Sequence, residues 1–209
     1  MTIQQIKHAV YVVYRECNIQ SFPVRPDLIL QQCGYQLYTY EGIKNTHPEL
    51  YALCKACSED AFTHKKTRKT IVKHNVVIGR LRFSLAHELG HVLLDNMVTG
   101  SQQNREDVAD LFASHLLVPR IAISIEGCKN AQDIHDVFGL SYAAANKTWI
   151  GYTQKSESIL SDIDYKIGDL LYLSQEERSQ WEFFENISPL VVQLCLNKST
   201  CKNNMEENL

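Results

Sequence analysis

The chain has 209 residues, of which 44% are hydrophobic and 22% charged, with a formal net charge of -3. This length and composition allow a sizeable buried core, which excludes an intrinsically disordered protein. The opening MTIQQIKHAV lacks an apolar signal segment, and no uninterrupted apolar run approaches the roughly 18 residues that span a bilayer. The seven cysteines favour reduced thiols over a disulfide framework, so we expect a cytoplasmic protein with no membrane partner.

The first part of the chain predicts helices followed by a small sheet. Apolar residues at helical spacing indicate a helix over 4–17, and Asp27 is placed to cap a short helix that runs to Gln32. The alternating segment YQLYTY, residues 35–40, is typical of a strand. AFTH and TIVKHN flank KKTRK, which favours an antiparallel hairpin with a basic tip.

The second part is predicted to be helical. Helices are expected over 80–95 and 104–117, the latter ended by Pro119. Residues 130–152 fit a helix, a turn at FGLS and a second helix, and the remainder is acidic and helical with a frayed tail. The fold class expected is α+β, mainly helical with a small antiparallel sheet.

Charge is distributed unevenly along the chain. Residues 62–86 carry seven Lys or Arg and no Asp or Glu, whereas residues 157–185 carry eight acids against Lys166 and Arg178. Such asymmetry can mark a partner surface, but solvated faces that attract each other are the favoured interpretation.

The stretch RFSLAHELGHVLLD, residues 82–95, combines apolar residues with two histidines and a glutamate. His87 and His91 are four residues apart, so a helix places both imidazoles on one face, where they can reach one ion. Glu88 is rotated by about 100° and lies beside the pair, where a general base belongs. This HExxH pattern is the signature of a zinc hydrolase.

A catalytic zinc site usually needs a third protein ligand. The residues after His91 lack the metzincin continuation, but the helix NREDVADLFASHLLVP offers Glu106 as a ligand. Asp110, one turn later on the same face, can accept a hydrogen bond from a ligand histidine, although it is also the alternative ligand. The small Ala109 and Ala113 on that face would allow close packing against Gly90, which otherwise costs a helix about 1 kcal/mol.

The segments RFSLAHELGH and EDVADLFASHLLVP resemble the ImmA/IrrE family of bacterial metallopeptidases, which pair R-F-[ST]-x-A-H-E-x-G-H with E-x-x-A-[ND]-x-F-A-x-x-L-L-x-P. The resemblance extends from CSEDAFTH to DIHDVFGLSYAAANKTW. It implies zinc held by His87, His91 and Glu106, with Glu88 catalytic. It also implies a zincin-like metallopeptidase domain over 1–127 and a helix-turn-helix-like segment over 128–155, leaving 156–209 as an acidic helical region with a frayed tail.

Family members that act as site-specific proteases cut helix-turn-helix repressors of phages, mobile elements or stress regulons, so the resemblance implies a zinc endopeptidase with a protein substrate. A non-proteolytic antirepressor and a DNA-binding regulator are the alternatives. DNA binding is disfavoured because residues 129–157 have no net positive charge, and because Asn146, Lys147 and Thr148 follow the Ala-Ala pair where relatives carry Ala-Ala-x-x-Arg. Residues 130–152 and the acidic carboxy-terminal region are the expected docking surfaces for the partner.

Other polar residues have simpler interpretations. The lone CxxC of Cys54 and Cys57 lacks the second pair of a zinc ribbon, so core or incidental thiols are favoured. His64 and His74, on either side of the basic tip, could reach a substrate carbonyl but are more typical of exposed histidines. His115 is rotated by about 180° from Glu106 and should be satisfied locally.

Overall fold

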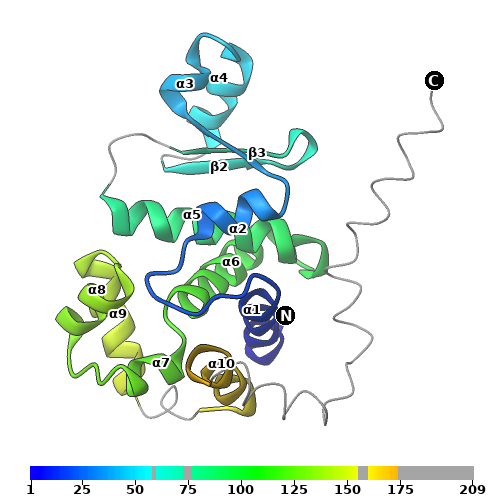
Figure 1. The fold of residues 1–209 in the computed structure, drawn as a ribbon. Helices are drawn as coiled ribbons and strands as arrows, with labels where there is room; N and C mark the ends of the chain where they lie inside the picture. The colour runs from blue at the N-terminus through cyan, green and yellow to red at the C-terminus, as the bar shows by residue number, and fades with distance from the viewer. Residues whose placement is uncertain (58–59, 73–76, 155–159, 174–209) are drawn as a thin grey trace. The chain divides into compact units, whose positions relative to one another are not determined.

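The computed structural model describes residues 1–57, 60–72, 77–154 and 160–173. Every helix and strand given below lies within Met1–Tyr172, which forms one compact unit. Helices dominate this unit and surround one small sheet, which confirms the expected α+β class (Figure 1). The predicted division at 127/128 and 155/156 stays a prediction.

The sheet has three strands in the order β1-β3-β2, with β1 at Gln36–Thr39, β2 at Ala61–His64 and β3 at Lys69–Val72. β2 and β3 form the predicted antiparallel hairpin, whose tip is the 3-10 turn η1, Lys65–Thr67. β1 pairs with β3 in parallel, so the sheet is mixed rather than purely antiparallel. The parallel pairing is possible because the chain between β1 and β2 forms a crossover through two helices, α3 and α4.

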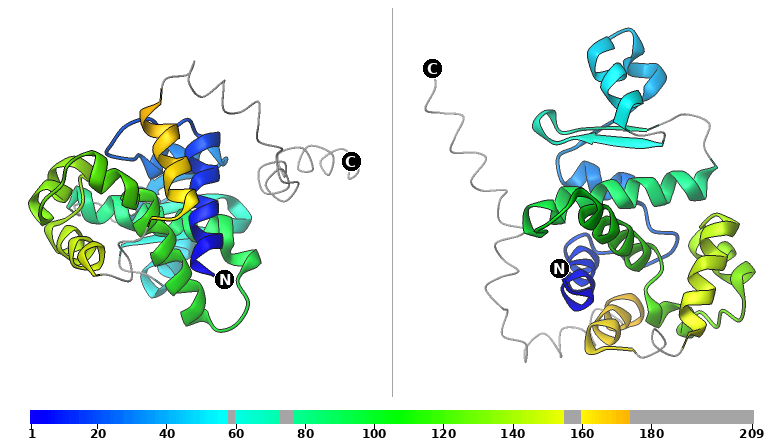
Figure 2. Two further views of the ribbon diagram at one scale, coloured as in Figure 1. Left: turned by 90° about the horizontal axis from the view of Figure 1, so that it is seen from below. Right: turned by 180° about the vertical axis from the view of Figure 1, so that it is seen from behind.

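The crossover helices α3, Tyr40–Lys44, and α4, Pro48–Cys57, cover one face of the sheet, and α5, Ile78–Leu94, covers the other, as both Figure 1 and Figure 2 show. Tyr40, Ile43 and Cys54 form a small second core beneath the crossover. The main core lies on the side of α5, where α1, Ile3–Glu16, packs against α6, Gln102–Leu117. The sheet is therefore one layer between two helical layers.

The crossing of α5 and α6 is close because its contact residues are small. A Cβ added to Gly90 would lie 3.1 Å from the Cα of Ala109 and 3.2 Å from Cδ1 of Phe112. The expected packing of Gly90 against the alanine face is therefore present at Ala109. This approach fixes the separation between the two helices that carry the histidines and the third predicted ligand.

The amino-terminal cap of α2, Pro26–Gln32, differs from the sequence prediction. Arg25, and not Asp27, occupies the N-cap position, where it forms no side-chain capping bond. Pro26 begins the helix, because its fixed φ suits the first helical position. Asp27 lies in the first turn and pairs with Arg25 at 2.6 Å.

The predicted helix-turn-helix-like segment consists of α8, Ala131–Phe138, and α9, Tyr142–Thr153. The turn between them packs on the beginning of α5. A Cβ at Gly79 would overlap the backbone of Leu140 and Ser141, and Arg82 donates a hydrogen bond to the carbonyl oxygen of Gly139. The turn therefore contacts the helix that carries the two histidines.

The last described helix, α10 at Asp162–Tyr172, packs on α1 and on α7, Arg120–Ile125. Lys7 of α1 pairs with Asp164 at 2.7 Å, and the Asp164 side chain is only 2% exposed. The frayed tail predicted from the sequence lies outside the described residues. Because α10 closes the core, a truncation that preserves this unit has to begin after it.

One stretch, Gln102–Ile125, is long and apolar enough to cross a membrane by composition alone. It consists of α6 and α7, with Pro119 between them as the N-cap of α7. Within the protein, 61% of its most apolar window is buried. These helices thus form part of the core of the described unit.

Candidate metal centre

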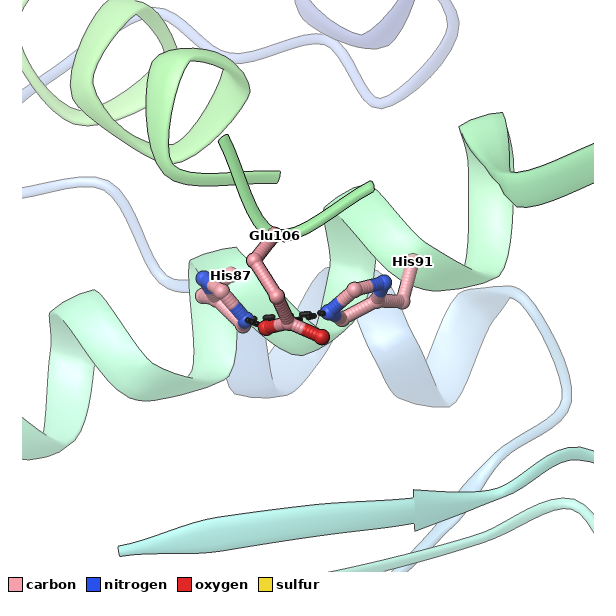
Figure 3. A group of neighbouring side chains, drawn as sticks. All are labelled: His87, His91 and Glu106. Carbon is pink, nitrogen blue, oxygen red and sulfur yellow. Dashed lines mark hydrogen bonds and ion pairs between the residues drawn. The ribbon is translucent and has the colours of Figure 1, made fainter. Parts of the chain in front are cut away.

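Three side chains from two helices converge on one point, as Figure 3 shows. His87 and His91 project from α5, and Glu106 projects from the first turns of α6. The Nε2 atoms of the two imidazoles are 3.0 Å apart, and Oε2 of Glu106 lies 3.2 Å from Nε2 of His87 and 3.4 Å from Nε2 of His91. The helical spacing and the close α5–α6 crossing together produce this cluster.

The spacing of these atoms fits a small tetrahedral cation. Zinc binds imidazole nitrogen and carboxylate oxygen at about 2.0–2.2 Å, which places neighbouring ligands of a tetrahedron about 3.3 Å apart. The separations of 3.0, 3.2 and 3.4 Å lie close to that value. The cluster can therefore hold a metal ion, and its two nitrogens and one oxygen are a donor set typical of catalytic zinc.

Each imidazole is oriented by a carboxylate on its other nitrogen. Nδ1 of His87 lies 2.7 Å from Oδ1 of Asp110, and Nδ1 of His91 lies 2.8 Å from Oδ1 of Asp95. When Nδ1 donates its proton to a carboxylate, the lone pair of the neutral ring is on Nε2, which faces the cluster. Both rings are thus oriented so that Nε2 could bind a metal ion.

Asp110 was predicted from sequence as a partner of a ligand histidine, whereas Asp95 was not. Asp95 is the C-cap residue of α5 and lies four residues after His91, so one helical turn brings them together. The same i, i+4 rule that paired the two histidines could have identified this contact.

These contacts shift the pKa values of the site. Burial lowers the pKa of His87, but the hydrogen bond and charge of Asp110 outweigh it, so the pKa rises above its usual value. The same hydrogen bond lowers the pKa of Asp110. Burial raises the pKa of Glu88, against the opposing effects of a hydrogen bond to Thr63 and the two nearby imidazoles. A raised proton affinity suits a carboxylate that has to accept a proton and later release it.

The cluster opens into a cleft of about 630 Å³ between β2 and α5. The cleft is lined by all three clustered side chains and by Glu88. Its other walls include Phe62 and Thr63 of β2 and Phe83 of α5. A polypeptide segment entering this cleft would reach the cluster and Glu88 together.

The remaining sequence candidates that the structure describes lie outside the cluster. Nδ1 of His64 is 2.7 Å from Oγ1 of Thr67 within the hairpin turn, and Cys54 is buried in the small second core. His74 and the side chain of Cys57 lie outside the described residues. His115 is not part of the cluster; burial, together with nearby cationic charges, lowers its pKa to about 4.

Comparison with known proteins supports the same region. Residues 60–149 match the family model Peptidase_M78, described as an IrrE N-terminal-like domain, and this range includes the cluster, Glu88 and both carboxylate partners. A solved structure described as a Mycobacterium tuberculosis transcriptional regulator aligns with a TM-score of 0.49 and 15% identity, over 68% of this chain and 45% of that one. The chain thus spans less than half of that regulator. No curated protein matches.

Proposed function

We propose that this chain is a zinc-dependent endopeptidase, because residues 60–149 match the Peptidase_M78 family model, as the resemblance to ImmA/IrrE proteins predicted. The observation that carries the proposal is the convergence of His87, His91 and Glu106 beside Glu88 at the floor of one cleft. A zinc ion held there would supply Lewis acidity, which activates water and polarises a carbonyl group.

The protein's own contribution begins with Glu88. Its carboxylate lines the cleft, and burial raises its affinity for a proton. In the proposed reaction Glu88 accepts a proton from the attacking water and delivers it to the leaving amine. Asp110 and Asp95 hold the imidazole rings in place, so that the ligand atoms need no reorganisation during turnover.

The shape of the cleft favours an extended polypeptide as substrate. β2 is an edge strand of the sheet, and it lines the cleft opposite the catalytic helix. Extended peptides often bind alongside edge strands, where backbone hydrogen bonds provide affinity without demanding a particular sequence. We therefore place the scissile segment next to β2.

The partner we propose is a helix-turn-helix repressor of a phage, a mobile element or a stress regulon, cut at one or two sites in the cytoplasm. The family resemblance is the support for this partner. A folded repressor exposes few extended segments, so cleavage would be selective, and unstructured casein should be degraded far more slowly than the repressor.

Two other functions remain as alternatives, namely a non-proteolytic antirepressor and a DNA-binding regulator. The position of the α8–α9 turn argues against DNA binding, because the turn is packed on α5 through Gly79 and Arg82. The zero net charge of residues 129–157 also argues against it.

The test is Glu88→Gln, with Asp107→Asn as the control. Asp107 is an exposed carboxylate on α6 that accepts a hydrogen bond from Gln103, and its substitution makes the same change of charge outside the cleft. We expect Glu88→Gln still to bind zinc and the repressor, but mass spectrometry should detect no cleavage products. Asp107→Asn should cleave the repressor at the wild-type rate. Full derepression of a reporter by Glu88→Gln would favour the antirepressor instead.

A further inference from the structure

The tip of the β2–β3 hairpin contacts the metal centre from outside its ligand set. Nζ of Lys65, the first residue of η1, lies 2.5 Å from Oδ2 of Asp95. The other carboxylate oxygen, Oδ1, faces Nδ1 of His91 at 2.8 Å. Asp95 therefore bridges a cation on the hairpin and a histidine of the cluster.

The same hairpin also contacts the catalytic glutamate. Thr63, two residues before Lys65, hydrogen-bonds to Glu88. Lys65, Thr63 and Asp95 all line the cleft. One hairpin thus contacts both the general base and, through Asp95, a metal-binding imidazole.

We propose that Lys65 and Asp95 are positioning residues for the metal centre. Lys65 fixes the Asp95 carboxylate, and Asp95 in turn fixes the orientation and tautomer of the His91 ring. The inference rests on the proposed metal site. It assigns to the hairpin tip a role in metal retention, in addition to any attraction of an acidic partner by its positive charge.

The geometry distinguishes Lys65 from its neighbour. Lys66 is an exposed cation on the same turn, so a general effect of positive charge near the cleft would be similar for both residues. An effect transmitted through Asp95 would be specific to Lys65. The Lys65–Asp95 pair therefore predicts an effect on metal retention for Lys65 that Lys66 does not share.

The experiment measures the dissociation constant of Co²⁺ by chelator competition, together with the visible spectrum of the bound ion, so that it does not depend on peptidase activity. Asp95→Ala should weaken binding about 10- to 100-fold, as the loss of a partner of a ligand histidine does. Lys65→Ala should weaken it about two- to five-fold, because a partly exposed ion pair contributes modestly. Lys65→Arg should restore affinity, and Lys66→Ala should match the wild type.

A double-variant cycle identifies the route of the effect. If Lys65 acts through Asp95, Lys65→Ala should have no further effect in a chain that already carries Asp95→Ala. Equal Co²⁺ affinity in Lys65→Ala, Lys66→Ala and the wild type would overturn this inference alone. An undiminished effect of Lys65→Ala in the Asp95→Ala chain would also overturn it. A wild-type chain that binds no Co²⁺ would overturn both this inference and the proposed function.

Discussion

Gly90→Ala tests whether the close crossing of α5 and α6 sets the geometry of the metal centre. An alanine in a helix interior is intrinsically about 1 kcal/mol more favourable than glycine. The added Cβ, however, would lie 3.1 Å from the Cα of Ala109 and 3.2 Å from Cδ1 of Phe112, whose side chain is fully buried. Overpacking of this kind costs about 1–3 kcal/mol. We therefore expect a net loss of about 1 kcal/mol in the free energy of unfolding.

Gly90→Ala should also lower the zinc affinity, by more than the small loss of stability suggests. Relief of the contact requires α5 and α6 to separate, which moves Glu106 away from the two histidines of α5. Urea unfolding of the metal-free protein measures the stability, and competition with a chelator measures the zinc affinity, which should fall. A variant about 1 kcal/mol more stable than the wild type, with unchanged zinc affinity, would show that helix propensity alone had acted and that the α5–α6 contact does not set the geometry of the site.

Three further predictions concern the site and the core. Zinc affinity should fall about 10- to 100-fold in Asp110→Ala and much further in Glu106→Ala, and the opposite order would make Asp110 the ligand. Asp164→Ala should lower the free energy of unfolding by roughly 3 kcal/mol, because it leaves Lys7 without its buried partner; an unchanged urea midpoint would show that the pair contributes little. His115, whose pKa burial lowers to about 4, binds fewer protons folded than unfolded between pH 6.5 and 4. The free energy of unfolding should therefore fall by about 2 kcal/mol between pH 7 and 4.5, and urea titrations of His115→Gln should show a smaller fall.

The cluster of His87, His91 and Glu106 could be predicted from sequence because it depends on local geometry. Two histidines four residues apart share a helix face, and the face of α6 that carries Glu106 is identifiable from the same period. The small residues at Gly90 and Ala109 further indicated which helix faces meet. The structure brings these elements together by the contact that the residue sizes suggest.

Contacts between distant segments were harder to predict. The Lys65–Asp95 pair joins residues 30 positions apart, and nothing in the sequence indicates that the hairpin tip folds over the end of α5. The parallel pairing of β1 with β3 likewise depends on the crossover helices, since a strand pattern alone does not give its pairing direction. The short helices α3 and α7 were missed because five or six residues carry too little periodicity to detect.

The most direct test of the central claim is the X-ray absorption spectrum of the zinc-loaded chain at the zinc edge. We expect one zinc per chain, with only nitrogen and oxygen neighbours at about 2.0–2.2 Å and the outer-shell scattering of two imidazoles. This result would place the ion between His87, His91 and Glu106. Sulfur neighbours at about 2.3 Å would indicate cysteine ligands and exclude a zinc site at His87, His91 and Glu106, as would a chain that retains no zinc.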